Sequence, residues 1–164
     1  MRTLLIMVST GLILSFGIKV VNAAEYKYKV DGIVCEKCVK DIESSLSNLK
    51  GVNEVNVSLE KGKVSVKAES KEVSSQNLAK VIEDIAEGKF KVKEITQKIH
   101  VEGMTCEGCV IAVKSALSKI EGVKNTEVSL KDKEAEVSYD PKKVKISQLL
   151  EAINKIAYRA SLPE

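Results

Sequence analysis

Apolar and polar residues alternate along several short stretches of the chain, and apolar residues recur every three or four positions along others. Alternation places one face of a strand in a core, whereas a spacing of three and four places one face of a helix there. The elements predicted for the first half are a strand at 26–30, a helix at 38–49, strands at 52–59 and 63–68, a helix from Ser74 or Ser75 to about Gly88, and a strand from Phe90.

The second half repeats this pattern. Displacing the sequence by about 71 positions puts Cys35 on Cys106 and Cys38 on Cys109, and about a third of the aligned positions match. The corresponding elements are a strand around Ile99 and Val101, a helix along Val110 to Ile120, strands at 123–130 and 135–139, a helix at 147–156 and a short strand at 158–162.

The order strand, helix, strand, strand, helix, strand is the split βαβ arrangement. The sequence therefore predicts an α+β protein with two tandem ferredoxin-like βαββαβ domains, at 24–94 and 95–164. Residues 93–97 are the stretch left free to link the domains, and they contain no glycine or proline run.

The first 23 residues have the pattern of an export signal. Arg2 is the charged start, an apolar run extends from Leu4 to Ile18, and Val21-Asn22-Ala23 is a small-residue cleavage site. We predict cleavage after Ala23 and a soluble periplasmic protein that is not embedded in the membrane. The alternative is an uncleaved anchor, for which the apolar run is short.

Charge and composition exclude several classes of function. The formal charge of +3 falls to +1 once Arg2 and Lys19 leave with the signal, and the remaining charges are interleaved. With no Trp and no basic stripe, we expect no nucleic-acid partner. One histidine and no Ser/His/Asp set leave little basis for acid-base catalysis.

The four cysteines form two C-x-x-C pairs, Cys35 with Cys38 and Cys106 with Cys109. Each pair follows a predicted strand and precedes a predicted helix, so the thiols lie at a helix N-terminus, where the helix dipole favours the thiolate. A thiolate binds soft metals and also attacks disulfides, so metal binding and redox chemistry are both open. A C-x-x-C disulfide closes too small a loop to add much stability.

Two thiolates suit a soft ion that accepts two ligands, which indicates Cu(I) or Hg(II). Zinc takes four ligands in a tetrahedron, and the two pairs would supply them together if the domains folded face to face. Neither pair alone supplies four ligands.

The run Gly103-Met104-Thr105-Cys106-x-x-Cys109, followed after the helix by Gly122-Val123, resembles the heavy-metal-associated domain. The second unit is particularly similar to the mercuric-ion-binding proteins of that family, through Val113-Lys114-x-Ala116-Leu117-Ser118-Lys119-x-Glu121-Gly122-Val123. The first unit is similar more loosely, with Ile33 and Val34 where the family usually has Met and Thr.

The resemblance implies a monomeric carrier, not an enzyme. It would capture Hg(II) or Cu(I) on its thiolates and pass the ion by ligand exchange to a membrane heavy-metal transporter or P-type ATPase. Cys35 and Cys106 would be the exposed thiols that meet the ion first, and Cys38 and Cys109 the thiols of lower pKa. The alternative is a thiol-disulfide oxidoreductase, although neither pair has the Trp and Pro typical of thioredoxin-like sites.

Three residues near the second pair have two interpretations each. Met104 is a thioether ligand or core filler, and the position favours core filler. His100 is a ligand or a polar strand residue, and its strand favours the second. Tyr158 matches an aromatic residue that the family carries near the metal loop, where it either shields the site or packs in the core; Phe90 is its counterpart in the first unit.

Overall fold

The computed structural model describes residues 23–69 and 71–163. The predicted export signal, 1–23, lies outside these residues except for Ala23. None of the helices in the described part of the chain is long and apolar enough to cross a membrane. The elements there are β1 (Ala24–Asp31), α1 (Glu36–Ser47), β2 (Val52–Ser58), β3 (Lys63–Ala68), α2 (Ser75–Asp84), the 3-10 turn η1 (Ile85–Gly88), β4 (Lys91–Glu102), α3 (Glu107–Ser118), β5 (Val123–Ser129), β6 (Glu134–Tyr139), α4 (Ile146–Asn154) and β7 (Arg159–Ser161).

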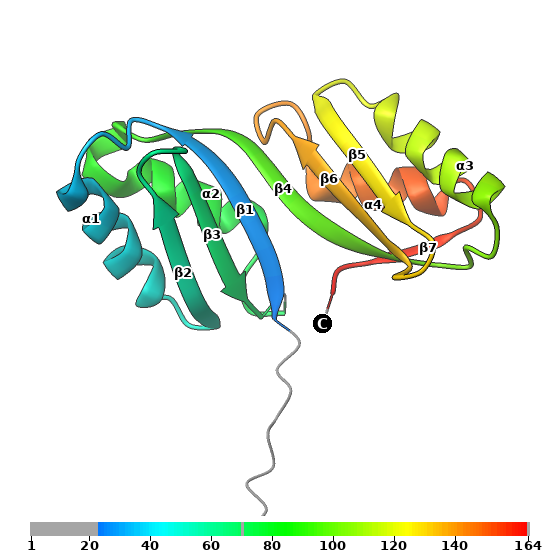
Figure 1. The fold of residues 1–164 in the computed structure, drawn as a ribbon, viewed down its shortest axis with the longest axis horizontal. Coiled ribbons are helices and arrows are strands. Elements are labelled where there is room, and N and C mark those ends of the chain that lie inside the picture. The colour runs from blue at the N-terminus through cyan, green and yellow to red at the C-terminus, as the bar shows by residue number, and fades with distance from the viewer. Residues whose placement is uncertain (1–22, 70, 164) are drawn as a thin grey trace, which may run out of the picture.

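Within the described residues, all of these strands form one continuous antiparallel sheet, in the order β2-β3-β1-β4-β6-β5 (Figure 1). β7 pairs with the end of β4. Each half has the α+β, ferredoxin-like order predicted from the sequence. The shared strand β4 contributes its first part to the first unit and its last part to the second.

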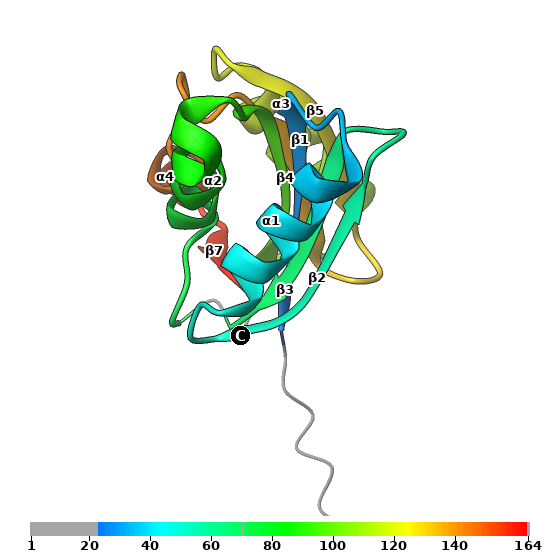
Figure 2. The same cartoon turned by 90° about the vertical axis from the view of Figure 1, so that its left-hand side faces the viewer.

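The helices cover one face of this sheet. The register pairs Tyr28 with Ile95 and Ile95 with Tyr139, so these buried side chains point to the same face in both units. α2 of the first unit and α4 of the second lie on the same side of the sheet (Figure 2). Apolar residues four apart on each helix complete the core: Ile42 and Leu46, Leu78 and Ile82, Val113 and Leu117, Leu149 and Ile153.

The predicted linker at 93–97 is wrong, because these residues form the middle of β4. Ile95 and Gln97 are almost fully buried and pair with β1 on one side and β6 on the other. The predicted boundary between 94 and 95 therefore falls inside a strand. A register shift at Lys29 and Val30 and the buried polar Gln97 interrupt the simple alternation from which a strand is recognised.

A buried polar cluster lies where the units meet. The Tyr28 hydroxyl donates to the Ser75 carbonyl at 3.0 Å, and the Tyr139 hydroxyl donates to Gln97 Oε1 at 3.3 Å. The hydroxyls of Ser75 and Tyr139 lie 3.3 Å apart. Burial raises the pKa of Tyr28 well above its ordinary range, so its hydroxyl stays protonated and can donate. We call Tyr28, Ser75, Gln97 and Tyr139 the junction cluster.

Candidate metal-binding site

Each cysteine pair lies at the start of a helix. Cys35 is the N-cap of α1 and Cys106 is the N-cap of α3, both with an extended backbone. In both caps the sulfur of the first cysteine accepts the backbone N–H of the second, at 3.1 Å for Cys38 and 3.3 Å for Cys109. The cap uses one of the N–H groups that a helix start leaves unpaired, so the first cysteine is part of the helix terminus and does not lie away from it.

The second pair carries free thiols of unequal exposure. Cys106 is exposed, whereas Cys109 is 9% exposed. The pKa of Cys109 is lowered to about 6, chiefly by the hydrogen bond from Cys106, then by hydrogen bonds from the Tyr158 hydroxyl and the Thr105 backbone. The exposure of Cys106 and the lowered pKa of Cys109 agree with what was predicted of each thiol. The same prediction is wrong for Cys35, which is half-buried and not exposed.

Tyr158 lies beside the second pair and contacts it directly. Its pKa is raised, mainly by the hydrogen bond to Cys109, which favours the protonated hydroxyl. Its ring lies against Gly103, where an added Cβ would be 3.5 Å from the ring. Ala157 holds a φ of 66°, and Asn154 Oδ1 accepts the N–H of Ala160 at 2.9 Å, so the turn before Tyr158 is fixed from both sides. Both interpretations of Tyr158 apply, since its side chain contacts the thiol site and also packs, partly buried, against the core.

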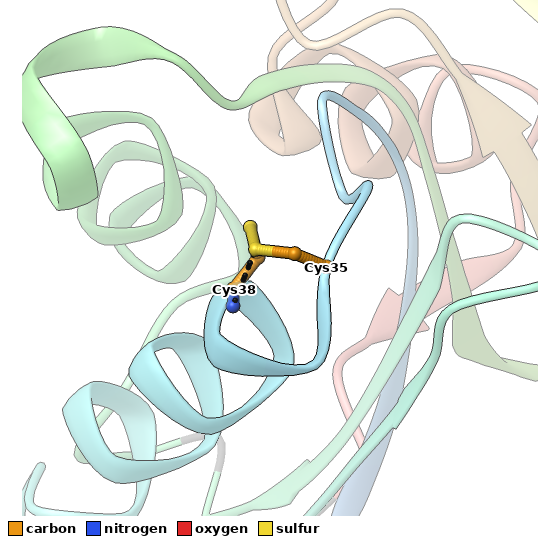
Figure 3. Close-up of a disulfide and its surroundings, with 2 residues drawn as sticks. All are labelled: Cys35 and Cys38. Atoms are coloured by element: carbon orange, nitrogen blue, oxygen red, sulfur yellow. Dashed lines mark hydrogen bonds between the residues drawn. A yellow bond between two sulfur atoms is a disulfide. The ribbon is translucent and has the colours of Figure 1, made fainter.

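The first pair differs in its chemistry. Cys35 and Cys38 form a disulfide at the start of α1 (Figure 3). A Cβ added at Gly32 would be 3.5 Å from the Phe90 ring, just as one added at Gly103 would be from the Tyr158 ring, which confirms the two aromatic residues as counterparts. Val34 is 82% exposed and occupies the place of Thr105. The first loop therefore has apolar side chains at both positions where the second has hydroxyls.

The other candidate ligands lie away from the thiols or inside the core. Met104 is 3% exposed and belongs to the core, as its position favoured. His100 is half-buried on β4 and pairs with Glu134 and Ser161 in the sheet. In the described part of the chain, no three or more His, Cys, Asp or Glu side chains gather as a metal site. A four-thiolate zinc site is not formed either, because the loops lie at opposite ends of β4 (Figure 1).

The sequence pattern of the heavy-metal-associated domain matches residues 27–91 and again residues 98–159. The chain belongs to the heavy-metal-associated domain family. Human copper-transporting ATPase 2 is 34% identical over 148 residues, an alignment that covers 82% of this chain and 10% of the ATPase. The chain thus spans about a tenth of the length of this curated relative.

Two solved structures are similar to this chain, one to both of its units and one to a single unit. The N-terminal soluble domains of Bacillus subtilis CopA are 31% identical, covering 85% of this chain and 93% of that one, with a TM-score of 0.43. Oxidized MerP from Ralstonia metallidurans CH34 is 35% identical, covering 43% of this chain and 99% of that one, with a TM-score of 0.42.

The four cysteines of these heavy-metal-associated units could be identified from the sequence, but the residues that position and distinguish the two pairs could not. The different oxidation of the two pairs has no signal in a C-x-x-C spacing, which both pairs share. The roles of Asn154 and Ala157 were also missed, since neither residue is of a ligand type. One difference between the repeats could have indicated that the two pairs differ. The first unit has Val34 where the second has Thr105, and Phe90 where the second has Tyr158, so the first pair lacks two neighbouring hydroxyls.

Proposed function

We propose that this protein is a carrier for a soft, two-coordinate metal ion, which it binds through Cys106 and Cys109 and, when that pair is reduced, through Cys35 and Cys38. The observation that carries the proposal is the second loop: one exposed thiol and one buried thiol whose pKa is lowered to about 6. At neutral pH this pair supplies a thiolate without a base, and a thiolate is the form that binds soft metals.

The transfer step proposed is ligand exchange. Two thiolates of the donor protein hold the ion, and Cys106, being exposed, adds to it first as a thiolate to give a three-coordinate ion. One donor thiolate then leaves, Cys109 bonds to the ion in its place, and the second donor thiolate leaves last, so that the ion ends on Cys106 and Cys109. Any proton that an incoming thiol loses passes to solvent, from which the departing donor thiolates can take one up. No electron is transferred, and the ion keeps its charge throughout.

Two ions are candidates for the cargo. Cu(I) is supported by the human copper-transporting ATPase 2, whose similarity extends across both units of this chain. Hg(II) is supported by the resemblance of the second unit to mercuric-ion-binding proteins. Both ions are soft and both accept two thiolates, so the donor set alone is compatible with either.

The place of action and the partner are also proposals. The pattern of residues 1–23 supports export to the periplasm, and a membrane transporter or P-type ATPase is the partner that would receive the ion. The relatives support a partner of that class, since copper-transporting ATPases carry similar segments.

The test is a competitive titration of the reduced, signal-free protein with Cu(I) and Hg(II) against a small dithiol, following bound metal and free thiols together. The double variant Cys106→Ser/Cys109→Ser should lose the tighter site, and the matched variant Cys35→Ser/Cys38→Ser should keep it. Failure of both ions to bind, combined with catalytic reduction or oxidation of a disulfide substrate, would replace the carrier with the thiol-disulfide oxidoreductase.

A further inference from the structure

The two cysteine pairs share most of their local geometry. Both lie at a helix start, and in both the sulfur of the first cysteine accepts the backbone N–H of the second, at 3.1 Å in the first pair and 3.3 Å in the second. The spacing, the cap and the helix dipole therefore act alike on both pairs. They do not explain why the first pair is a disulfide (Figure 3) and the second is two free thiols.

The hydrogen-bond donors beside the sulfurs do differ between the pairs. In the second unit the Tyr158 hydroxyl donates to Cys109, and the Thr105 hydroxyl lies 4.0 Å from the same sulfur. The corresponding residues of the first unit are Phe90, which is 3% exposed, and Val34, and neither side chain has a hydroxyl. The second pair thus has donors for a thiolate where the first has apolar side chains.

Donors of this kind favour the reduced form of a cysteine pair. Only the reduced form contains a thiolate, whereas the sulfurs of a disulfide are neutral and gain little from a donor. A pair whose reduced form is stabilised has a disulfide that is more easily reduced. Apolar surroundings disfavour the thiolate. The first pair is therefore the one that should oxidise more readily.

One charge difference between the loops acts in the opposite direction. Lys37 occupies the place of Gly108, and a cation beside the first pair favours its thiolates. The Lys37 side chain is exposed, so solvent and salt screen its charge. The direct hydrogen bond from Tyr158 to Cys109 should therefore have the larger effect.

We propose that the first pair is a redox-controlled metal site, closed as a disulfide under conditions in which the second pair is still a free dithiol. A disulfide offers no thiolate to a soft metal, so the protein would carry an ion on its second unit alone until the first pair is reduced. This inference rests on the proposed carrier function and adds redox control of one of its two sites.

The co-reactant is a small disulfide or, in the reverse direction, a small thiol. One cysteine of the first pair attacks the small disulfide as a thiolate, which forms a mixed disulfide and releases one small thiolate. The other cysteine then attacks the protein sulfur of the mixed disulfide, which closes the Cys35–Cys38 bond and releases the second small thiolate. Two electrons pass from the pair to the small disulfide, and the protons of the two cysteines pass through solvent to the two small thiols.

The first arm of the test needs no metal. The variant Cys106→Ser/Cys109→Ser reports the first pair, and Cys35→Ser/Cys38→Ser reports the second. Each is equilibrated without oxygen in oxidised and reduced glutathione, and the remaining thiols are alkylated and counted. The first pair should be half oxidised at a ratio of oxidised to squared reduced glutathione that is about tenfold lower, or about 30 mV. Equal midpoints, or the reverse order, would overturn the proposal.

A further pair of variants tests the cause of the difference. Tyr158→Phe, made in the variant that keeps the second pair, should remove most of the difference in midpoint. The matched control is Lys37→Gln in the variant that keeps the first pair, which changes the charge of a loop and no donor to a sulfur, and its midpoint should hardly move. A shift in Lys37→Gln as large as that in Tyr158→Phe would assign the difference to charge and overturn the proposed cause.

The second arm measures the metal site. Wild-type protein is poised between the two midpoints, desalted without oxygen and titrated with Hg(II), which should fill the second pair only. After full reduction and desalting, Hg(II) should fill both pairs. Filling of both pairs in the poised protein, or of the second pair alone in the reduced protein, would overturn the redox control. If reduced protein binds no Hg(II) or Cu(I) while the midpoints differ, the carrier function has failed and the redox difference between the pairs stands.

Discussion

Hydrogen bonds to a single sulfur lower the pKa of Cys109 in the second thiol pair. Cys109 receives hydrogen bonds from Cys106 and Tyr158, and these stabilise its thiolate over its thiol. Metal ions and protons compete for the same sulfur, so binding to this pair should weaken as the pH falls through about 6.

Replacing Tyr158 by Phe should raise the pKa of Cys109. The substitution removes the hydroxyl and keeps the ring that packs against Gly103. The measurement is the pH dependence of Cys109 alkylation in the Cys106→Ser background, with and without Tyr158→Phe. The matched control is Tyr26→Phe, whose buried hydroxyl has no hydrogen-bond partner among the described atoms. An unchanged pKa in Tyr158→Phe would show that this hydroxyl does not reach the thiolate.

At this scale the sequence located all four cysteines but not the difference between the pairs. A helix start and a C-x-x-C spacing are local features, so they could be read from the chain. The contact between Tyr158 and Cys109 joins residues far apart in sequence and depends on the turn at Ala157. Phe90 lies three positions later than the repeat requires because η1 adds a turn after α2.

Among the elements, the turn from α3 into β5 has a strict backbone requirement. Gly122 has a φ of 104°, and an added Cβ would lie 2.7 Å from Lys143 Cβ and 2.8 Å from Val144 Cγ2. Gly51 has the same role in the first unit, with Glu72 Cβ at 2.7 Å. In each unit, this close contact packs the turn after the first helix against the segment that leads into the second helix.

Gly122→Ala should therefore destabilise the protein by about 1 to 3 kcal/mol or more, because strain at a positive φ adds to the close contact. Urea unfolding measures the change. Gly108→Ala is the control within α3. A Cβ added at Gly108 would lie 3.7 Å from its nearest neighbour, Cys106 Sγ, which is an ordinary contact. Alanine in a helix is more stable than glycine by about 0.5 to 1 kcal/mol. Equal effects of the two substitutions would contradict this account.

Most elements could be predicted from periodicity alone, and the differences have local causes. β3 matches its predicted range of 63–68, since its alternation is unbroken. α1 begins at Glu36 rather than Cys38 because Cys35 provides the cap. β4 was divided into two strands and a linker because Gln97 is a buried polar residue, and its burial depends on Tyr139 from the other unit.

For the whole molecule, the shared strand predicts that both units unfold together. Ile95 is fully buried between them, and truncating such a residue typically costs 2 to 5 kcal/mol. Ile95→Ala should shift one common transition in urea, with hydrogen exchange in β3 and β6 changing together. Val34→Ala, at an 82% exposed position, should shift it by no more than about 0.5 kcal/mol. Separate transitions, or a loss confined to one unit, would show that the units fold independently.

The shared strand also determines what a proteolytic cut between the repeats would release. Cleavage near residue 94 would leave each half with an incomplete β4, a strand edge without its neighbour, and a tyrosine-lined apolar surface open to water. Unprotected strand edges beside apolar surface are sites where chains associate with one another. Separated halves of this tandem protein would therefore tend to aggregate or to recombine with each other.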